Sequence, residues 1–160
     1  MTVIGLISDT HGLLRPEAVA ALQGSDHVIH AGDIGSPAII DALRRVAPVT
    51  AVRGNNDQGT WAEVLPLTTI IEFEAVRILV VHDLKTLNLD TVSEDIRVII
   101  SGHSHRPVRD EQRGRLLINP GSAGPRRFRL PISIGRLLIA ADRLESSLCT
   151  LGPRSRSGAA

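Results

Sequence analysis

The chain has 160 residues, a formal net charge of +1 and only three aromatic side chains of the Phe and Trp type. A charge balance near zero with so few aromatics argues against a protein built to bind nucleic acid. No apolar run approaches the ~20 residues of a membrane helix, and no signal peptide precedes the first strand pattern, so we expect a cytoplasmic protein without a membrane partner. Cys149 is the one cysteine, which suits a reducing compartment. We expect it to pack in a terminal strand.

The first half of the chain alternates predicted strands and helices. Apolar runs predict strands at residues 3–7, 27–30 and 49–52. Pro16 begins one helical stretch, and Ser36 followed by Pro37 has the pattern of an N-cap and first helical residue. Strands that alternate with helices at this spacing predict parallel α/β units.

The second half is rich in predicted strands. They lie at residues 68–73, 76–81, 97–100, 107–111, 115–118, 132–140 and 144–151, with turns at 74–75, 113–114 and 142–143. We expect one domain, residues 1–151, with two packed sheets and helices outside. The tail, residues 152–160, has little apolar content, which predicts disorder.

Five polar motifs each follow an apolar run. They are Asp9-x-His11, Gly32-Asp33, Gly54-Asn55-Asn56-Asp57, His82-Asp83 and Gly102-His103-Ser104-His105. Most of these motifs are weak alone, because Gly-Asp and Gly-Asn-Asn-Asp are also ordinary loop sequences, whereas Gly-His-Ser-His is moderately specific because clustered exposed histidines rarely serve packing. The ordered set is far more specific. Carboxylate, amide and imidazole groups delivered from successive strand ends are what a two-metal phosphoester-hydrolysing site requires.

The predicted metal ligands combine oxygen and nitrogen donors. Asp9 and His11 can converge on one ion from a loop, and Asp33 can bridge two ions because both its oxygens can be shared. Asn55 offers a neutral oxygen. The remaining ligands are the imidazoles of His82, His103 and His105. This set suits two divalent transition ions; we expect Mn, with Fe, Zn, Ni or Co as alternatives.

Other polar residues have competing interpretations. His27 begins a strand, and we expect it at the surface. His30 could support the metal centre, but we favour a hydrogen-bonded core histidine. Arg126, Arg127 and the nearby Arg129 could contact substrate phosphate, although a solvated basic loop fits equally well.

Together these motifs resemble the calcineurin-like metallophosphoesterase superfamily. The chain is similar to the small bacterial and archaeal phosphodiesterase branch of this superfamily over about residues 2–151. The similarity lies in its length, in residues 4–12 and in the Asn119-Pro120-Gly121-Ser122 segment. The resemblance implies an α/β fold, a four-layer α/β/β/α sandwich of two mixed sheets flanked by helices. It also implies two metal sites, the first formed by Asp9, His11, Asp33 and His105 and the second by Asp33, Asn55, His82 and His103.

Three positions depart from the family pattern. Asn56 replaces a histidine that in many superfamily phosphatases protonates the leaving group or stabilises the phosphoryl oxygens, so we expect Asn56, beside Asp57, to face substrate without acting as an acid. Asp83 replaces the glycine that usually follows His82. Only twenty residues separate His82 from His103. This leaves room for little of the usual helix and predicts a more open cleft.

The resemblance implies hydrolysis of a small phosphoester by a hydroxide that bridges two metals, with no catalytic side chain assigned. Without a general acid, reactive diesters should be preferred over monoesters. Nucleic acid is then expected only as a substrate. The alternative is an interaction scaffold of the same fold, like the retromer subunit that resembles this family. The residues leave the substrate, the metal and the oligomeric state open.

Overall fold

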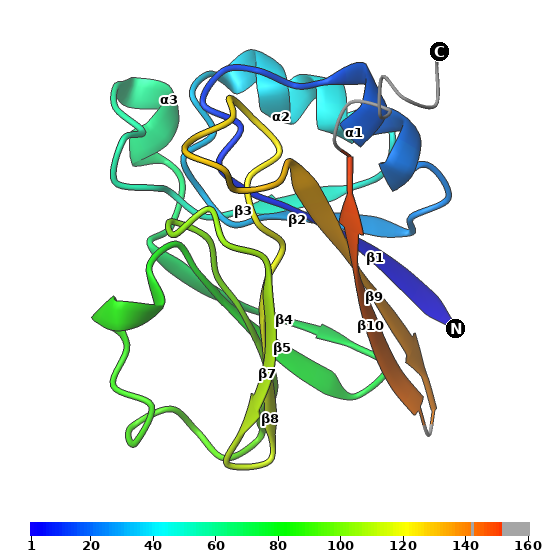
Figure 1. The fold of residues 1–160 in the computed structure, drawn as a ribbon. Helices are drawn as coiled ribbons and strands as arrows, with labels where there is room; N and C mark the ends of the chain where they lie inside the picture. The colour runs from blue at the N-terminus through cyan, green and yellow to red at the C-terminus, as the bar shows by residue number, and fades with distance from the viewer. Residues whose placement is uncertain (142, 152–160) are drawn as a thin grey trace.

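Two five-stranded mixed sheets pack face to face in the computed structural model, which describes residues 1–141 and 143–151 (Figure 1). The predicted tail, residues 152–160, lies outside the described residues, as does Asp142 of the last predicted turn. Among the helices of the described part of the chain, none is long and apolar enough to cross a membrane.

The first sheet contains the α/β half of the chain and its C-terminal hairpin. Its strand order is β10-β9-β1-β2-β3. The strands β1 (Thr2–Ile7), β2 (His27–His30) and β3 (Val49–Ala51) are parallel, and β9 (Ser133–Ala140) and β10 (Arg143–Thr150) add an antiparallel edge. The connecting helices are α1 (Pro16–Leu22) and α2 (Pro37–Arg44), both of which begin at the predicted proline.

The second sheet has the order β4-β5-β6-β8-β7. Its strands are β4 (Thr68–Phe73), β5 (Val76–Val81), β6 (Ile96–Ile100), β7 (Val108–Gln112) and β8 (Arg115–Asn119). Strands β5, β6 and β8 are parallel to one another. Central β6 is buried at four of its five residues, as expected for a nearly continuous apolar run.

Both predicted hairpin turns of the second sheet are confirmed. Glu74 and Ala75 connect β4 to β5 with φ values of +48° and +68°, and Arg113 and Gly114 connect β7 to β8 with +54° and +74°. Two successive residues at positive φ match the right-handed twist of the flanking strands.

Three apolar clusters correspond to the layers. The first lies between the sheets and includes Ile4, Ile29 and Ile100. A second packs α1 and α2 against the outer face of the first sheet, and α3 (Thr60–Glu63) contributes Trp61 to it. The sequence did not predict α3, because its four residues are too few to show a helical period.

The outer face of the second sheet has a much thinner cover. Its cluster, which includes Leu79 and Leu117, is covered by Leu84, Leu87 and Leu89 from the segment after β5. The only helical structure there among the described residues is the 3₁₀ turn η1 (Leu84–Thr86). Two mixed sheets flanked by helices are thus confirmed. The short interval after His82 leaves the fourth layer as one turn and a loop.

The prediction that Cys149 packs in a terminal strand is wrong. Cys149 lies in β10, but its side chain is exposed. Strand β10 is at the edge of the first sheet, and its last four residues are all exposed. An apolar residue type therefore does not identify a buried position on this strand.

Candidate metal centre

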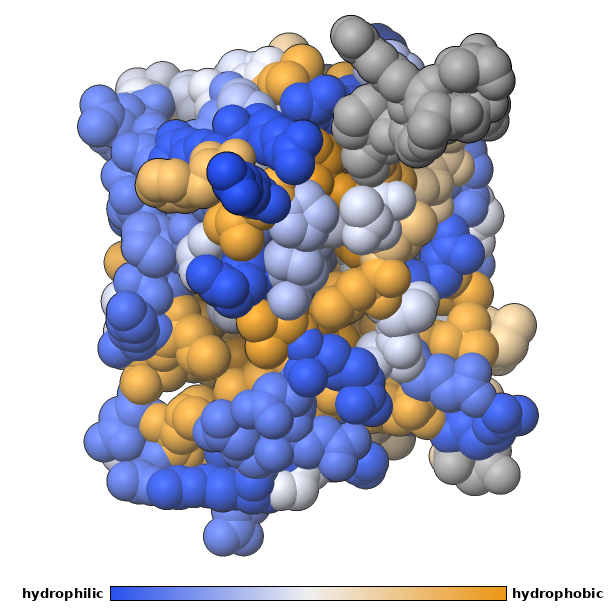
Figure 2. Space-filling view, viewed as in Figure 1, coloured by the Kyte–Doolittle hydropathy of each residue, from blue (hydrophilic) through white to orange (hydrophobic). Residues whose placement is uncertain are grey.

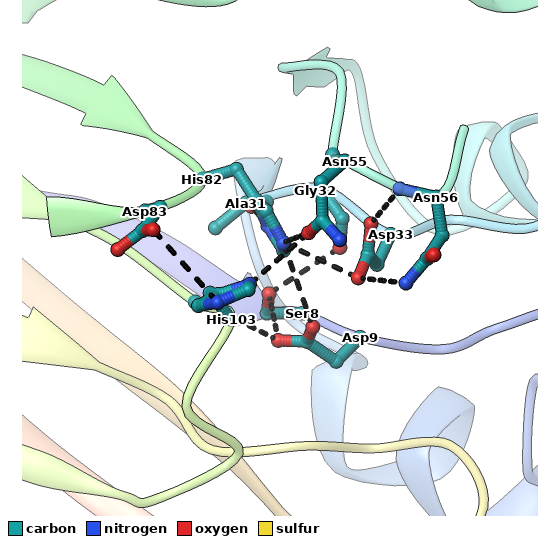
Figure 3. Close-up of polar contacts among 12 residues, drawn as sticks. Ser8, Asp9, Ala31, Gly32, Asp33, Asn55, Asn56, His82, Asp83 and His103 are labelled. Carbon is teal, nitrogen blue, oxygen red and sulfur yellow. Dashed lines mark hydrogen bonds and ion pairs between the residues drawn. The ribbon is translucent and has the colours of Figure 1, made fainter. Parts of the chain in front are cut away.

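All the predicted ligands lie in loops at one edge of the two sheets, where the parallel strands end. The loops follow β1, β2 and β3 in the first sheet and β5 and β6 in the second (Figures 1 and 3). Because parallel strands present their carboxyl ends at the same edge, residues far apart in the sequence meet there. This arrangement explains the recurrence of polar motifs after apolar runs.

The loops hold most of the predicted ligands in a left-handed backbone conformation. This group has φ between +45° and +71° and comprises Asp9, His11, Asp33, His103 and His105. Non-glycine residues rarely adopt such angles, which cost free energy and cluster at functional sites. Backbone hydrogen bonds stabilise them: the N–H of Asp9 donates to Gly32 O at 3.0 Å, and that of His11 donates to Asp33 O at 2.9 Å.

A first group of ligand atoms comes from Asp9, His11 and His105, which all lie within 4.8 Å of one another. Asp9 Oδ1 is 3.4 Å from His105 Nε2 and 3.8 Å from His11 Nε2. The two Nε2 atoms are 3.3 Å apart. Among the described residues, buried Asp9 Oδ1 has no hydrogen-bond donor. Leaving a buried carboxylate oxygen unpaired is costly, and a cation among these three atoms would remove that cost.

A second group joins Asp33, His82 and His103. His82 Nε2 is 3.3 Å from Asp33 Oδ2. The amide oxygen of Asn55 completes the group, 2.9 Å from His82 Nε2 and 3.0 Å from His103 Nδ1 (Figure 3). His82 Nδ1–H donates to Ala31 O at 2.7 Å. This bond orients the ring so that the neutral form directs its Nε2 lone pair at the group.

Asp33 lies between the two groups. Its Oδ2 is 3.7 Å from His11 Nε2 and 3.3 Å from His82 Nε2. Burial alone would raise the pKa of Asp33, but hydrogen bonds from His82 and from Asn56 outweigh it and hold the pKa well below its ordinary range. The carboxylate is therefore ionised and positioned to serve cations on both sides.

Asn56 contacts Asp33 directly, rather than only facing a substrate. Its backbone N–H donates to Asp33 Oδ1 at 2.8 Å, and its side-chain Nδ2 donates to Oδ2 at 3.0 Å (Figure 3). The side chain is exposed, so a substrate can still reach it. Its amide hydrogens, however, are partly committed to orienting Asp33.

Asp57 holds the loops together through its carboxylate. Its Oδ1 accepts hydrogen bonds from the backbone N–H groups of Ile34 and Gly35 at 2.9 and 3.0 Å, and its Oδ2 accepts one from Gly54 at 2.8 Å. The side chain is buried. Asp57 therefore connects the loop after β2 to the loop after β3.

The histidines around the site differ in protonation tendency. Burial lowers the pKa of His82, but the Asp33 hydrogen bond and the Asp9 charge outweigh it and leave the pKa raised. Burial lowers the pKa of His11 despite attraction from Asp33 and Asp9. The lowered pKa of His11 favours the neutral ring that metal ligation requires, whereas a cation bound at His82 has to displace the proton that the raised pKa favours.

His30 is the hydrogen-bonded core histidine that the sequence favoured. The Thr10 hydroxyl donates to Ile34 O at 2.7 Å, so it accepts from His30 Nε2–H at 3.0 Å. The Nδ1 atom accepts from Gly32 N–H at 3.1 Å. Both ring nitrogens are thus used by the neutral form, and burial lowers the pKa to about 4. His30 connects the loops after β1 and β2 without ligating.

His27, expected at the surface, is only half-exposed. Its Nε2 atom lies 2.7 Å from Thr50 Oγ1, and its ring packs 5.0 Å from the ring of Phe73. Burial lowers its pKa. The lateral pairing of β2 with β3 brings Thr50 beside it, which a single strand pattern does not reveal.

Asp83 lies at the rim of the site, and Arg126 and Arg127 belong to the loop between β8 and β9. Arg126 and Arg127 are exposed, and the charge of Arg127 contributes to lowering the pKa of His11. Arg127 is therefore near the first group. Asp83 Oδ2 is 3.8 Å from His103 Nε2 (Figure 3), and Asp83 Oδ1 accepts from Lys85 N–H to cap η1.

Two supporting residues were missed from the sequence. Ser8 Oγ donates to Asp9 Oδ2 at 2.7 Å. Asn119 donates from Nδ2 to Gly102 O at 2.8 Å and to Ser104 Oγ at 3.0 Å, which shapes the loop between His103 and His105. The signal for Asn119 was its place in an Asn-Pro-Gly-Ser segment, but its partners could not be read from that segment.

Glycines allow the ligand loops to approach each other closely. A Cβ atom on Gly54 would lie 2.1 Å from Asp33 Oδ1, and one on Gly102 would lie 2.0 Å from Ser8 Oγ. Both residues directly precede a ligand segment. Their lack of a side chain lets Asn55 approach Asp33, and His103 approach Asp9.

Comparison with known proteins agrees with this geometry. Residues 1–142 match the calcineurin-like phosphoesterase superfamily domain. The chain belongs to this superfamily. A relative described as a probable metallophosphoesterase, from Methanocaldococcus jannaschii, is 37% identical over 91% of this chain and 80% of its own length. The protein is thus one of the metal-dependent phosphoesterases, whose small archaeal and bacterial branch the sequence had indicated.

Two solved structures share the fold. An archaeal phosphodiesterase superposes with a TM-score of 0.76 at 25% identity, covering 92% of this chain and 100% of that one. Vps29 of Entamoeba histolytica, complexed with Zn²⁺, superposes with a TM-score of 0.73 at 21% identity, covering 94% of this chain and 100% of that one. The second likeness shows the fold alone.

Proposed function

We propose that the protein is a phosphodiesterase that uses two divalent ions. The first ion would be held by Asp9, His11, Asp33 and His105, and the second by Asp33, Asn55, His82 and His103. The position of Asp33 between the two groups carries the proposal, because its Oδ2 lies within 3.7 Å of both His11 Nε2 and His82 Nε2. Mixed oxygen and nitrogen ligands favour Mn, Fe, Zn, Ni or Co, and we expect Mn.

The residues of the chain hold the ions and orient the substrate. When bound, two such ions supply Lewis acidity and an activated water near neutral pH. Arg126 and Arg127 are exposed, and the charge of Arg127 reaches His11 of the first group. A guanidinium there can pair with phosphate oxygens. His82 is oriented by Ala31 O, and Asp33 by Asn56. These contacts keep the ligand geometry fixed before substrate arrives.

A preference for esters with good leaving groups follows from the missing acid. At position 56 the side chain is an amide, which has no proton to give to a leaving group near neutral pH, and it donates to Asp33. Asp57 is buried, and its carboxylate accepts three backbone hydrogen bonds. Esters with good leaving groups should therefore react best. Likeness to an archaeal phosphodiesterase supports the same substrate class.

The test is turnover by chelator-stripped protein reloaded with Mn²⁺. Bis(p-nitrophenyl) phosphate should be hydrolysed faster than p-nitrophenyl phosphate, and calorimetry should show two bound ions. Asp33→Ala should lose both ions and roughly 10²-fold or more in rate. The matched control is Asp41→Ala, an exposed aspartate on α2 that pairs with Arg44. Two bound ions without turnover of any ester would favour the interaction scaffold instead.

The location of the protein stays a prediction. Cys149 is an exposed free thiol, which suits a reducing compartment such as the cytoplasm.

A further inference from the structure

A cavity of about 650 Å³ lies on the outer face of the second sheet, beside the metal centre. Its apolar walls include Leu84, Leu87, Leu89, Val108 and Leu117. In Figure 2 hydrophobic residues gather at this place, between the loop after β5 and strands β7 and β8, around a visible hollow. Small-molecule sites have volumes of about 300–1,000 Å³ and mostly apolar walls.

The cavity exists because the fourth layer is so thin. Between His82 and β6 the chain forms only η1 and a loop, whose leucines cover part of the sheet. On the sheet side, Val108 pairs with Asn119, and Gln112 pairs with Arg115. Residues opposite each other in an antiparallel pair share a face, so Val108 and Gln112 lie on the same outer face as Leu117.

One wall of the cavity is shared with the metal centre. The lining includes Gly102, His103 and Ser104, the loop that supplies a ligand to the second group. Asn119, also in the lining, holds this loop through hydrogen bonds to Gly102 O and Ser104 Oγ. A molecule whose phosphate reaches His103 therefore has the cavity open next to it.

The lining selects for an uncharged, apolar occupant. Among the lining residues, Asp83 contributes a negative charge and Lys85 a positive one. Their charges cancel, so the cavity offers no net attraction to a second anionic group. The leucine and valine walls instead gain free energy by burying apolar surface. A rigid ring loses little conformational entropy on entering such a site.

We propose that this cavity binds the organic group of the phosphoester substrate and that this group is an aryl or heteroaryl ring. The proposal rests on the proposed function, because the phosphate of the same molecule would sit at the metal centre. It adds a specificity site that the ligand residues do not contain. The short interval after His82, in place of a full helix, would then determine substrate class.

The test measures binding rather than turnover. Methyl-, phenyl- and naphthylphosphonate are titrated calorimetrically into the Mn²⁺-loaded protein, at a pH where all three are fully ionised. Affinity should rise from methyl to naphthyl by about tenfold or more, as expected for burying an aromatic ring. Val108→Trp should fill the cavity. The affinities for naphthylphosphonate and methylphosphonate should then agree within about twofold, while the affinity for methylphosphonate stays unchanged.

Matched variants separate filling of the cavity from general damage. Gln112→Trp, on the same strand and face, should repeat the effect of Val108→Trp if either variant proves unstable. Ile70→Trp is the control, because Ile70 is exposed on β4, the opposite edge strand of the same sheet, outside the cavity. It should leave the whole series unchanged.

The outcomes distinguish this proposal from the proposed function. Equal affinities along the series in a protein that hydrolyses diesters would overturn the cavity proposal and leave the phosphodiesterase proposal standing. A Val108-dependent preference for naphthylphosphonate without hydrolysis of any ester would support the cavity and overturn the phosphodiesterase. No binding of any phosphonate to the loaded protein would overturn the cavity proposal.

Discussion

Asn56 holds both carboxylate oxygens of Asp33, one through its backbone N–H at 2.8 Å and the other through its side-chain amide at 3.0 Å. Many superfamily phosphatases have a histidine at this position. In this chain the residue orients the carboxylate that lies between the two ligand groups. Asparagine in place of histidine thus substitutes a side chain that orients the candidate ligand Asp33 for one that can donate a proton.

Asn56→Ala should weaken metal binding without abolishing it. The side-chain donor to Asp33 Oδ2 is lost, but the backbone donor to Oδ1 remains. Partners that orient a metal ligand are typically worth 10–100-fold in affinity, and we expect about tenfold here. Calorimetric titration with Mn²⁺ measures this affinity. Asn88→Ala, in an exposed loop, serves as the control. An unchanged affinity in Asn56→Ala would show that the backbone contact suffices.

Asn56→His tests whether the wild-type protein lacks a general acid. Wild-type rates should depend steeply on the pKa of the leaving group. The variant should raise rates for poor leaving groups, because a placed acid contributes typically 10²–10⁴-fold where proton transfer limits the reaction. The rate of the variant should also fall above about pH 6.5, as the new imidazole loses its proton. The measurement is a series of aryl diesters at saturating Mn²⁺, since loss of the amide donor weakens metal binding. If the rate depended equally steeply on leaving-group pKa in both proteins, another residue would already donate the proton.

Asp57→Asn should destabilise the fold. An asparagine can present one oxygen, but its NH₂ group would face one of the N–H donors of Ile34, Gly35 and Gly54 that Asp57 now accepts. A buried donor left unpaired costs about 1–3 kcal/mol, which corresponds to a fall in Tm of roughly 2–12 °C for a domain of this size. Thermal unfolding in chelator measures it. Asp41→Asn, on the exposed face of α2, should change Tm little, and a similar shift in both variants would contradict the role of Asp57.

The strand pattern of the sequence predicted the fold well, because period and turn signals are local. Residues 27–30, 68–73 and 76–81 are strands with the predicted bounds. Local signals also placed the candidate ligands in loops after strands, and parallel strands bring these loops to one edge. Residue type alone does not predict the backbone conformation of Glu74 and Ala75. Both adopt positive φ although neither residue type favours it. The flanking strands impose the turn there.

The partners of the supporting side chains could not be predicted from the sequence. Asp57 lies directly beside Asn56, yet one binds backbone groups 22 and 23 residues away and the other binds a carboxylate. Such choices depend on how loops from different strands are packed. The cavity beside His103 also depends on packing that the sequence does not reveal. The short interval after His82 predicted an open cleft, but its apolar lining required the register of β7 against β8.

His30 should make stability depend on pH in a defined window. Its pKa is about 4 in the folded protein because of burial, below the ordinary value of about 6.5. Between these values the unfolded chain binds a proton that the folded chain does not, so the free energy of unfolding falls as pH decreases from about 6.5 to 4. The full contribution is about 3 kcal/mol.

The comparison variant is His30→Gln, which cannot titrate. Urea unfolding in chelator should show wild type losing stability faster than the variant over this window, so that the difference between them shrinks by up to about 3 kcal/mol toward pH 4. The other titrating groups are common to both proteins and cancel in the difference. A difference independent of pH would mean that the folded protein binds the proton as readily as the unfolded chain. That result would contradict the hydrogen-bonding scheme, because an Nδ1 atom that accepts from Gly32 N–H cannot carry a proton.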